Sequence, residues 1–332
     1  MRTRKRNVHA KKRSDWKRMP GIVTHHMFGV DAYGSCPQLV GETQDALDAF
    51  LLGNLGPDPF FYLTASARMR KYRRIGQILH KQKTPQLLFA VHEHFIADRS
   101  RPESDARRAY ALGFVCHYLL DSTVHPLVYA QQHAVCNTHL EGLTGEWSHR
   151  VVHATIETSL DEYVLTTRLG ATAATLPPHK TMLRCPAPVL SSLSRAFSPA
   201  LKDIYGLRVP ETAFVSAVSL NRLAQQVLDS KSAGLRQRFD YLAGLGMASS
   251  YVQALSHRGK LNPRTPFTND DHIPWDVPFA EGTVINFSFD ELFSQTLHRA
   301  REVLPLYARD DFDLDACTAL AANINFLGRP VE

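Results

Sequence analysis

Apolar residues recur every three or four positions along most of this 332-residue sequence, a spacing that predicts helices rather than strands. No alternating run is long enough to form a useful strand, and the sequence shows no convincing internal repeat. The class predicted is therefore all-α, a multi-helix bundle. The helical pattern covers residues 42–55, 73–82, 84–98, 103–124, 145–165, 189–205, 210–228, 230–256, 287–308 and 311–327.

Proline, glycine and capping residues interrupt this pattern. Residues 56–59, Gly-Pro-Asp-Pro, predict a loop, because two prolines forbid a regular helix and the glycine permits a turn. Thr84 is expected to cap the helix that follows it, with Pro85 at the first helical position. We interpret residues 21–33 as a short polar and aromatic leading segment. Two further stretches with prolines are predicted as connections: 170–188 and 258–282.

Charge is distributed unevenly along the chain. Residues 1–18 hold nine Lys or Arg residues and one acid, a charge of +8; since the whole chain carries +6, the rest carries about −2. We interpret residues 1–18 as a basic, disordered tail that can touch nucleic acid or anionic lipid. Residues 19–332 are interpreted as one all-α domain, with a metal-site half at 20–165 and a helical C-terminal half at 187–328.

The sequence shows no sign of export or of membrane insertion. No apolar run reaches the roughly 18 residues that span a bilayer, and the nearest candidate, 110–129, is broken by two histidines and an aspartate. No apolar segment follows the basic run to form a usual secretory signal. The five cysteines are scattered without a Cys-x-x-Cys pair, which indicates reduced thiols. We therefore expect a cytoplasmic protein without a transmembrane segment.

Ionisable residues four apart mark one face of the helix predicted at 103–124 and just beyond it. His117, Asp121 and His125 lie at this spacing inside a strongly apolar sequence. A lone buried charge there costs several kcal/mol, roughly, unless it is paired or binds a metal. The pattern favours a metal site, although a hydrogen-bonded polar seam between helices is the alternative.

The helix predicted at 145–165 has a similar face. His153 and Glu157 are four apart, but such pairs are also common on solvated helix faces. His149 lies one turn earlier, so either imidazole can be the ligand, and Glu157 favours His153. Two helices that each present histidine and carboxylate from one face can surround divalent metal ions.

These residue types indicate zinc and hydrolysis. Zinc prefers histidine nitrogen and carboxylate oxygen, and catalytic zinc keeps a position open for water. Bound water ionises near neutral pH and becomes a nucleophile, while two metals can clamp both oxygens of a phosphoryl transfer. We predict a multi-zinc hydrolytic site from the following candidates: His25 or His26, Asp58, His80, His117, Asp121, His125, His153 and Glu157.

The order of the motifs around these residues carries a resemblance. A Thr-His pair is followed by Gly-Pro-Asp-Pro-Phe-Phe, a Gly-x-x-x-His helix, Gly-Phe-x-Cys-His-Tyr-x-x-Asp-Ser-x-x-His-Pro, and His-x3-Glu-x3-Asp. In this order they resemble the zinc-dependent phospholipase C family over roughly residues 20–165. That family includes secreted bacterial phosphatidylcholine-type phospholipases C, and its fold is similar to that of the S1/P1-type single-strand nucleases.

The resemblance implies an all-α fold with two or three zinc ions per chain. Carried over by motif, the first zinc would be held by Asp58, His80, His117 and Asp121; the second by His125, His153 and Glu157; and a third by His25 with Asp121 as the bridge. Asp58 would also be the catalytic general base. In secreted members the mature N-terminal residue completes the third zinc site, whereas here residues 1–18 precede the motif.

The function expected is a zinc-dependent hydrolase of phosphodiesters that acts like a phospholipase C, on a phospholipid or another phosphodiester, with transient contact with a membrane surface. A single-strand nuclease is the alternative hydrolase, for which Phe60, Phe61 and Tyr62 could stack on bases. The charge of about −2 outside the tail disfavours nucleic acid. A non-catalytic helical protein stabilised by zinc is the rival from another class.

Overall fold

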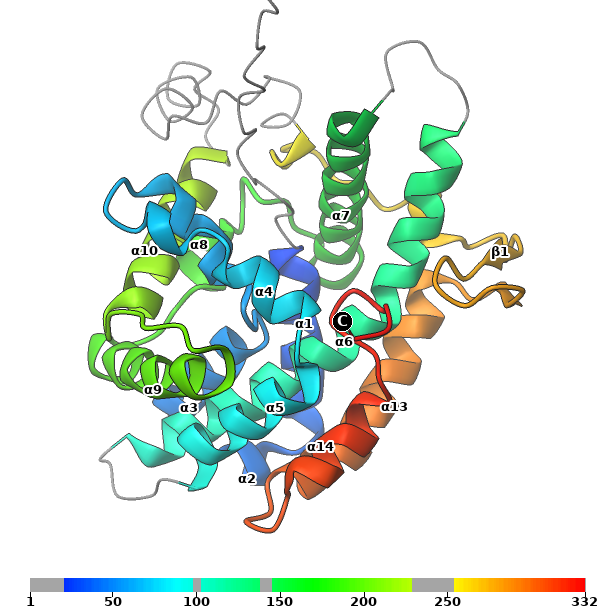
Figure 1. Cartoon of the computed structure of the whole chain (residues 1–332). Coiled ribbons are helices and arrows are strands. Elements are labelled where there is room, and N and C mark those ends of the chain that lie inside the picture. The colour runs from blue at the N-terminus through cyan, green and yellow to red at the C-terminus, as the bar shows by residue number, and fades with distance from the viewer. Residues whose placement is uncertain (1–20, 98–102, 138–144, 229–253, 332) are drawn as a thin grey trace, which may run out of the picture.

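The computed structural model describes residues 21–97, 103–137, 145–228 and 254–331, and these residues are mostly helical, as predicted (Figure 1). The helices of the first half are α1 (Ile22–Ser35), α2 (Pro37–Val40), α3 (Gln44–Gly53), α4 (Ile75–Lys81), α5 (Thr84–His92), α6 (Ser104–Cys136) and α7 (Gly145–Leu169). Those of the second half are α8 (Pro178–Thr181), α9 (Ala187–Tyr205), α10 (Ala213–Leu228), α13 (Phe289–Tyr307) and α14 (Leu314–Ala321).

Shorter elements connect these helices. The 3-10 helices are η1 (Asp58–Ala65), η2 (Arg70–Tyr72) and η4 (Pro266–Thr268), and η3 (Glu93–Ala97) is a π-helix. Two short antiparallel strands, β1 (Trp275–Asp276) and β2 (Val284–Ile285), form a hairpin within the connection predicted at 258–282 and just after it. No helix in the described part of the chain is both long enough and apolar enough to cross a membrane.

Helix α6 is the central element, and α3, α7 and α13 pack against it (Figure 1). Most of its residues are buried, including the whole stretch 109–121. A helix that is apolar on nearly every side is buried on every side. The polar residues in the middle of α6, His117, Asp121 and His125, are therefore buried inside the protein, away from water.

Two glycines let α3 approach α6 closely. A Cβ on Gly113 would lie 2.1 Å from the Phe50 carbonyl oxygen, and one on Gly53 would lie 2.2 Å from the Tyr110 carbonyl oxygen. Neither position has room for a side chain. The contact places the end of α3, with Asn54 just beyond it, directly against the middle of α6.

Aromatic side chains fill the core on one side of α6. Phe60, Phe95, Tyr110, Phe197 and Phe214 are each at most 1% exposed, and their rings meet mainly edge-to-face or tilted. Such arrangements stabilise the core beyond the area that they bury. This cluster fixes η1, and with it Asp58, against α6, α9 and α10.

Residues 21–33 are not an irregular leading segment, because they belong to helix α1. No side chain of its own first turn caps this helix. The Asp161 carboxylate on α7 does so instead: it accepts hydrogen bonds from the backbone N–H groups of Val23 and Thr24 at 3.1 and 2.8 Å, and from the Thr24 hydroxyl at 2.7 Å. A cap that lies so far away in sequence cannot be read from local pattern.

Two helix ends also differ from the prediction. Helix α6 does not stop at Val124 but continues through Pro126 to Cys136. Proline removes one backbone hydrogen bond, and packing on several sides compensates for that loss. The expected cap Thr84 lies inside α5, whose N-cap is Lys83 in a left-handed conformation with φ 54°.

The last predicted helix, 311–327, is shorter than its pattern suggested. Helix α14 ends at Ala321, where Ala322 and Asn323 adopt positive φ angles of 46° and 60°. The chain then forms a loop, 322–331, that returns to α6. The predictions for residues 1–18 and for most of the helix at 230–256 fall outside the described residues.

Replacing Gly113 by Ala is expected to lower the free energy of unfolding by about 1–3 kcal/mol, because the new methyl group overpacks the contact with the α3 backbone. Urea denaturation measures this. Gly34→Ala is the control: Gly34 is an exposed helical glycine with nothing within 4 Å of the added Cβ, so stability should stay the same or rise by up to about 1 kcal/mol. A Gly113→Ala protein as stable as wild type would contradict the role given to this contact.

Candidate metal centre

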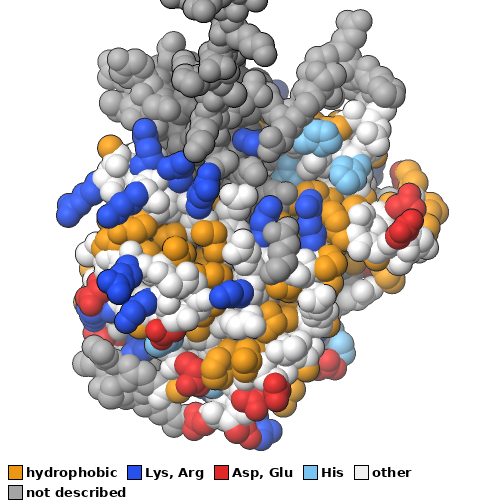
Figure 2. Space-filling model, viewed as in Figure 1, with side chains coloured by type: hydrophobic (Ala, Val, Ile, Leu, Met, Phe, Trp, Pro, Cys, Tyr) orange, Lys and Arg blue, Asp and Glu red, His pale blue; other side chains and the backbone are white. Residues whose placement is uncertain are grey.

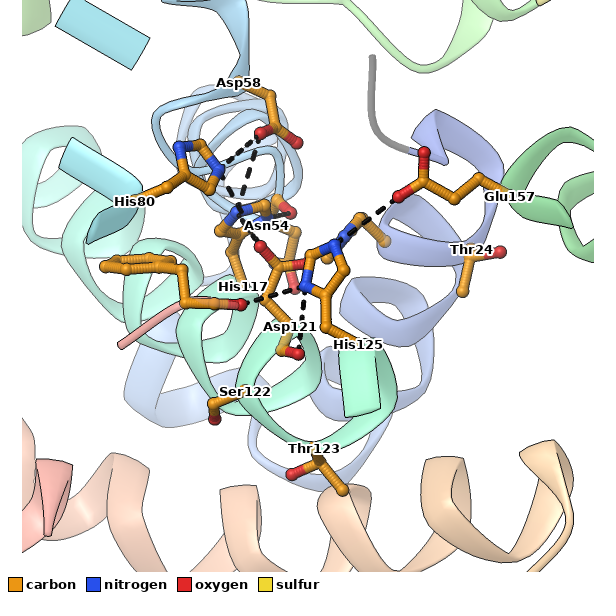
Figure 3. A network of polar contacts seen from close by, with 12 residues as sticks. Thr24, Asn54, Asp58, His80, His117, Asp121, Ser122, Thr123, His125 and Glu157 are labelled. Carbon is orange, nitrogen blue, oxygen red and sulfur yellow. Dashed lines mark hydrogen bonds and ion pairs between the residues drawn. The ribbon is translucent and has the colours of Figure 1, made fainter. Parts of the chain in front are cut away.

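All eight residues expected at the metal site lie together inside the protein, and all are buried. Figure 3 shows most of them: Asp58, His80, His117, Asp121, His125 and Glu157. The eight residues come from five elements. In chain order these residues are His25 on α1, Asp58 at the start of η1, His80 on α4, His117, Asp121 and His125 on α6, and His153 and Glu157 on α7. They form three groups in which every ligand atom lies within 4.8 Å of the others in its group, and two of these groups share His117.

The first group joins Asp58, His80 and His117. The His80 Nε2 lies 2.9 Å from the Asp58 Oδ1, and the His117 Nε2 lies 3.9 Å from the same oxygen. Burial lowers the pKa of His117, so its imidazole is neutral at pH 7. Two imidazole nitrogens therefore converge on one carboxylate.

Asp121 lies at the centre of the cluster (Figure 3). Its Oδ1 is 3.1 Å from His25 Nε2 and 3.4 Å from His125 Nδ1, while its Oδ2 is 3.2 Å from His117 Nε2. Burial by itself would raise the pKa of Asp121, but the imidazoles of His125, His117 and His25 outweigh burial and hold it well below its usual value. Asp121 is therefore ionised, and its two oxygens face the imidazoles of His25, His117 and His125.

The remaining group joins His125, His153 and Glu157. The Glu157 Oε1 lies 3.5 Å from His125 Nε2 and 3.1 Å from His153 Nε2. Burial opposes the ionisation of Glu157, yet the charge and hydrogen bonds of the two imidazoles lower its pKa to about 2. This group matches the expected second set of ligands.

Backbone carbonyls orient the imidazoles of the first group. The His80 Nδ1 lies 2.6 Å from the Gly76 carbonyl oxygen, and the His117 Nδ1 lies 3.1 Å from the Asn54 carbonyl oxygen. Because a carbonyl can only accept, each Nδ1 carries the proton and donates it. The Nε2 of the neutral ring then carries the lone pair that a metal needs.

Hydrogen-bond acceptors also orient the imidazoles of the group formed by His125, His153 and Glu157, which we call the second group. The His125 Nδ1 donates to the Phe326 carbonyl oxygen at 2.9 Å, and the His153 Nδ1 donates to the Gln132 side-chain oxygen at 2.8 Å. The Gln132 amide group lies 3.0 Å from His149 Nδ1, to which it can donate in turn. Gln132 thereby fixes the tautomer of His153.

Several polar atoms of the cluster are buried without a hydrogen-bond partner. They are Asp58 Oδ1, His80 Nε2, His117 Nε2, Asp121 Oδ2 and Glu157 Oε2. Leaving such atoms unsatisfied costs about 1–3 kcal/mol each, and more when they are charged. Lone pairs that face one another repel unless a cation lies between them, so this donor set of imidazole nitrogen and carboxylate oxygen fits divalent metal ions, and zinc in particular.

The geometry distinguishes between the histidines that the sequence left open. His25 faces Asp121, and although burial acts to lower its pKa, the hydrogen bond and charge of Asp121 raise it above its usual value. His26 belongs to none of the three groups, and burial lowers its pKa to about 4. His153 faces Glu157, whereas His149 lies beyond Gln132.

A small cavity of about 30 Å³ lies between α1, α6 and α7. Its lining includes Asp121, His125 and Glu157 together with apolar residues such as Val124 and Leu160. It is large enough for a water molecule and has polar partners for one. A larger hollow of about 760 Å³ lies along residues 130–134 and 264–275, and none of the expected ligands lines it.

Sequence reasoning missed the residues that hold the ligands in place. Asn54, Gly76 and Phe326 act through backbone carbonyls, which leave no side-chain signal. Gly56 has a φ of 48°, and a Cβ there would lie 2.2 Å from the His117 ring, so this glycine makes room for a ligand. Asp161 was visible as the last member of the four-residue series on α7, but its capping role was not.

The fold and the cluster define a class: helical proteins with a buried cluster of histidines and carboxylates that could hold metal. Comparison with models of protein families matches residues 24–195 to the zinc dependent phospholipase C family. The match covers half of the chain and contains all eight clustered residues, so the chain belongs to the zinc-dependent phospholipase C family. Neither the curated proteins nor the solved structures that were compared with the chain gave a match.

His153→Ala should lower the zinc content of the purified protein by about one ion per chain, because the second group loses a ligand and catalytic zinc needs about three from the protein. His149→Ala is the matched control, one helical turn away on α7, and should keep the wild-type content. Elemental analysis after dialysis against zinc-containing buffer measures both. If His149→Ala lost the ion and His153→Ala kept it, the assignment of the two histidines would be reversed.

Gln132→Met should weaken zinc binding at the second group by about 10- to 100-fold, because His153 loses the acceptor that fixes its tautomer. Competition with a chelator of known affinity measures the change. Gln131→Met provides the control, since Gln131 is the neighbouring residue on α6 but lines the hollow that contains no expected ligand. Equal zinc affinity in the two variants would show that Gln132 does not orient His153 for metal binding.

Proposed function

We propose that this protein is a zinc-dependent hydrolase of phosphodiesters that acts like a phospholipase C. The observation that carries the proposal is the convergence of imidazole Nε2 atoms on buried carboxylates, with each Nδ1 of His80, His117 and His153 held by an oxygen acceptor. Such an arrangement is suited to hold cations, because it directs the Nε2 lone pairs toward carboxylate oxygens. Family membership supports a phosphodiester as the substrate.

Two or three zinc ions would be held by the three groups. Asp58, His80 and His117, with Asp121, would hold the first; His125, His153 and Glu157 would hold the second; and His25 with Asp121 would contribute to a third. When bound, zinc supplies Lewis acidity, which lowers the pKa of water and stabilises negative charge on phosphoryl oxygens.

The side chains of this chain would do the remaining work. Asp58 is the residue that we assign as general base, because its carboxylate lies at the edge of the first group and can accept the proton of an attacking water. The η1 helix, packed on the aromatic core through Phe60, keeps that carboxylate in place. The oxygen of the water forms a bond to phosphorus as the bond from phosphorus to the diacylglycerol oxygen breaks, and that oxygen takes up the proton that Asp58 accepted from the water.

Basic side chains beside the site would suit an anionic substrate or a membrane surface. Residues 68–74, between η1 and α4, carry five Lys or Arg residues, and Arg68, Arg70 and Lys71 are exposed. Lys and Arg side chains gather over this part of the molecule (Figure 2). Although residues 19–332 carry a net charge of about −2, they include a local basic surface close to the elements that carry Asp58 and His80.

The nuclease alternative is less well supported than the sequence suggested. Of its candidate stacking residues, Phe60 is 0% exposed in the aromatic core and Tyr62 is 4% exposed. Phe61 is half-buried, and its ring lies 4.9 Å from the His80 ring. Two of the three rings are therefore not available to nucleic-acid bases.

The proposal predicts two or three zinc ions per chain by elemental analysis, and hydrolysis of a short-chain phospholipid that stops when a chelator removes the metal. Asp58→Asn should lower kcat/KM by about 100- to 10,000-fold, the usual contribution of a general base. Asp45→Asn, at an exposed position on α3, is the control for loss of one negative charge.

Three results would count against this function. Less than one metal ion per chain in zinc-supplied protein would leave the cluster as a hydrogen-bonded seam. A full complement of zinc with no hydrolysis of any phosphodiester, and a lower melting temperature after chelation, would favour the non-catalytic metal-stabilised protein. Faster cleavage of single-stranded DNA than of phospholipid would favour the nuclease.

A further inference from the structure

Arg329 lies in the loop 322–331, with its guanidinium group packed against two aromatic rings. The guanidinium carbon is 4.2 Å from the centroid of the Phe279 ring and 4.7 Å from that of Tyr129. The two rings meet each other edge-to-face, 5.1 Å apart, so the guanidinium occupies the corner that they form. Aromatic rings at this distance stabilise a guanidinium, which carries its N–H donors in a fixed plane.

The charge of Arg329 is not neutralised by an acid. No carboxylate in the described ranges of the chain pairs with it, and its Nε is buried without a hydrogen-bond partner. Its backbone N–H, by contrast, donates to the Asn325 side chain at 3.2 Å. The side chain is only partly buried, and a partly exposed guanidinium without an acidic partner is suited to receive an anion.

This group lies beside the metal centre. The Tyr129 ring is 5.2 Å from the His153 ring and 6.0 Å from the His125 ring, centroid to centroid. Since the guanidinium carbon is 4.7 Å from the Tyr129 centroid, it lies within about 10 Å of the His153 ring. Histidine side chains reach the surface in this region, near the C-terminal end of α6 and the N-terminal end of α7 (Figure 2).

The loop that carries Arg329 is held firmly. The Asn325 backbone N–H donates to the Arg329 carbonyl at 2.7 Å, and the Asn325 side chain accepts from the N–H groups of Leu327 and Arg329. The same loop supplies the Phe326 carbonyl that orients His125. The position of the guanidinium is therefore fixed relative to the second metal group.

We propose that Arg329 binds a second negative charge on the substrate, so that phospholipids with an anionic headgroup are hydrolysed in preference to those with choline. This inference rests on the proposed function. The acyl esters of a phospholipid are uncharged, so apart from the scissile phosphate only the headgroup can carry a negative charge. The cationic end of choline is repelled by an unpaired guanidinium, whereas a phosphate or carboxylate accepts two of its hydrogen bonds.

The experiment compares three short-chain phospholipids that have identical acyl chains and differ in the headgroup: choline, inositol, and inositol carrying a second phosphate. The wild-type protein, loaded with zinc, should show its highest kcat/KM with the phosphorylated headgroup and its lowest with choline. Arg329→Met keeps an apolar side chain against the two rings but removes the charge. It should reduce the preference for the phosphorylated headgroup over inositol by about 10- to 100-fold, mainly through KM.

Arg309→Met is the matched control, because Arg309 is exposed and paired with Asp311. It removes the same charge and should leave the ratio unchanged. Arg329→Lys keeps the charge without the bidentate edge and should recover part of the preference.

The outcomes separate this inference from the proposed function. Equal losses with all three lipids in Arg329→Met, together with a lower melting temperature, would reduce Arg329 to a structural clamp and overturn the inference while the hydrolase survives. No hydrolysis of any lipid by zinc-loaded wild type would overturn both. If the protein cleaved an oligonucleotide in preference to the lipids, and Arg329→Met lost this activity, the anion bound by Arg329 would be a neighbouring nucleotide phosphate. That result would overturn the headgroup assignment.

Discussion

The buried carboxylate of Asp121 is the constraint on which the rest of the structure depends. It lies in the middle of α6, a helix surrounded by protein, where an uncompensated charge costs several kcal/mol, roughly. Three imidazoles from α1 and α6 approach its two oxygens. Helices α1 and α4 each bring a histidine to this point, His25 and His80.

The imidazoles depend on a further layer of contacts. A histidine can serve a metal only if the correct nitrogen is free of a proton, and the carbonyls of Gly76, Asn54 and Phe326 decide this for three of them. The close approach of α3 to α6 at Gly53 and Gly113 places one of these carbonyls. The packing of α3 on α6 in the core therefore determines which nitrogen of His117 is free to bind a metal.

The helical class, most helix positions and the eight clustered residues could be predicted from the sequence, because helical periodicity and four-residue spacing are local signals. The helix at residues 22–35 could not, since its cap is Asp161, a residue far along the chain. The passage of α6 through Pro126 could not either, because the compensation comes from tertiary packing. Arg329 lies outside the motif region altogether, and only the folded chain brings it next to Tyr129.

The contact between Phe326 and His125 has a consequence for the order in which the protein matures. A chain is synthesised from its N-terminus, so His125 leaves the ribosome long before the carbonyl that orients it. Until the loop 322–331 has emerged and docked on α6, His125 lacks the carbonyl that fixes its tautomer. The second group is therefore complete only after this loop has docked, and a nascent chain that stops before Phe326 has less capacity to bind metal than one that includes the loop.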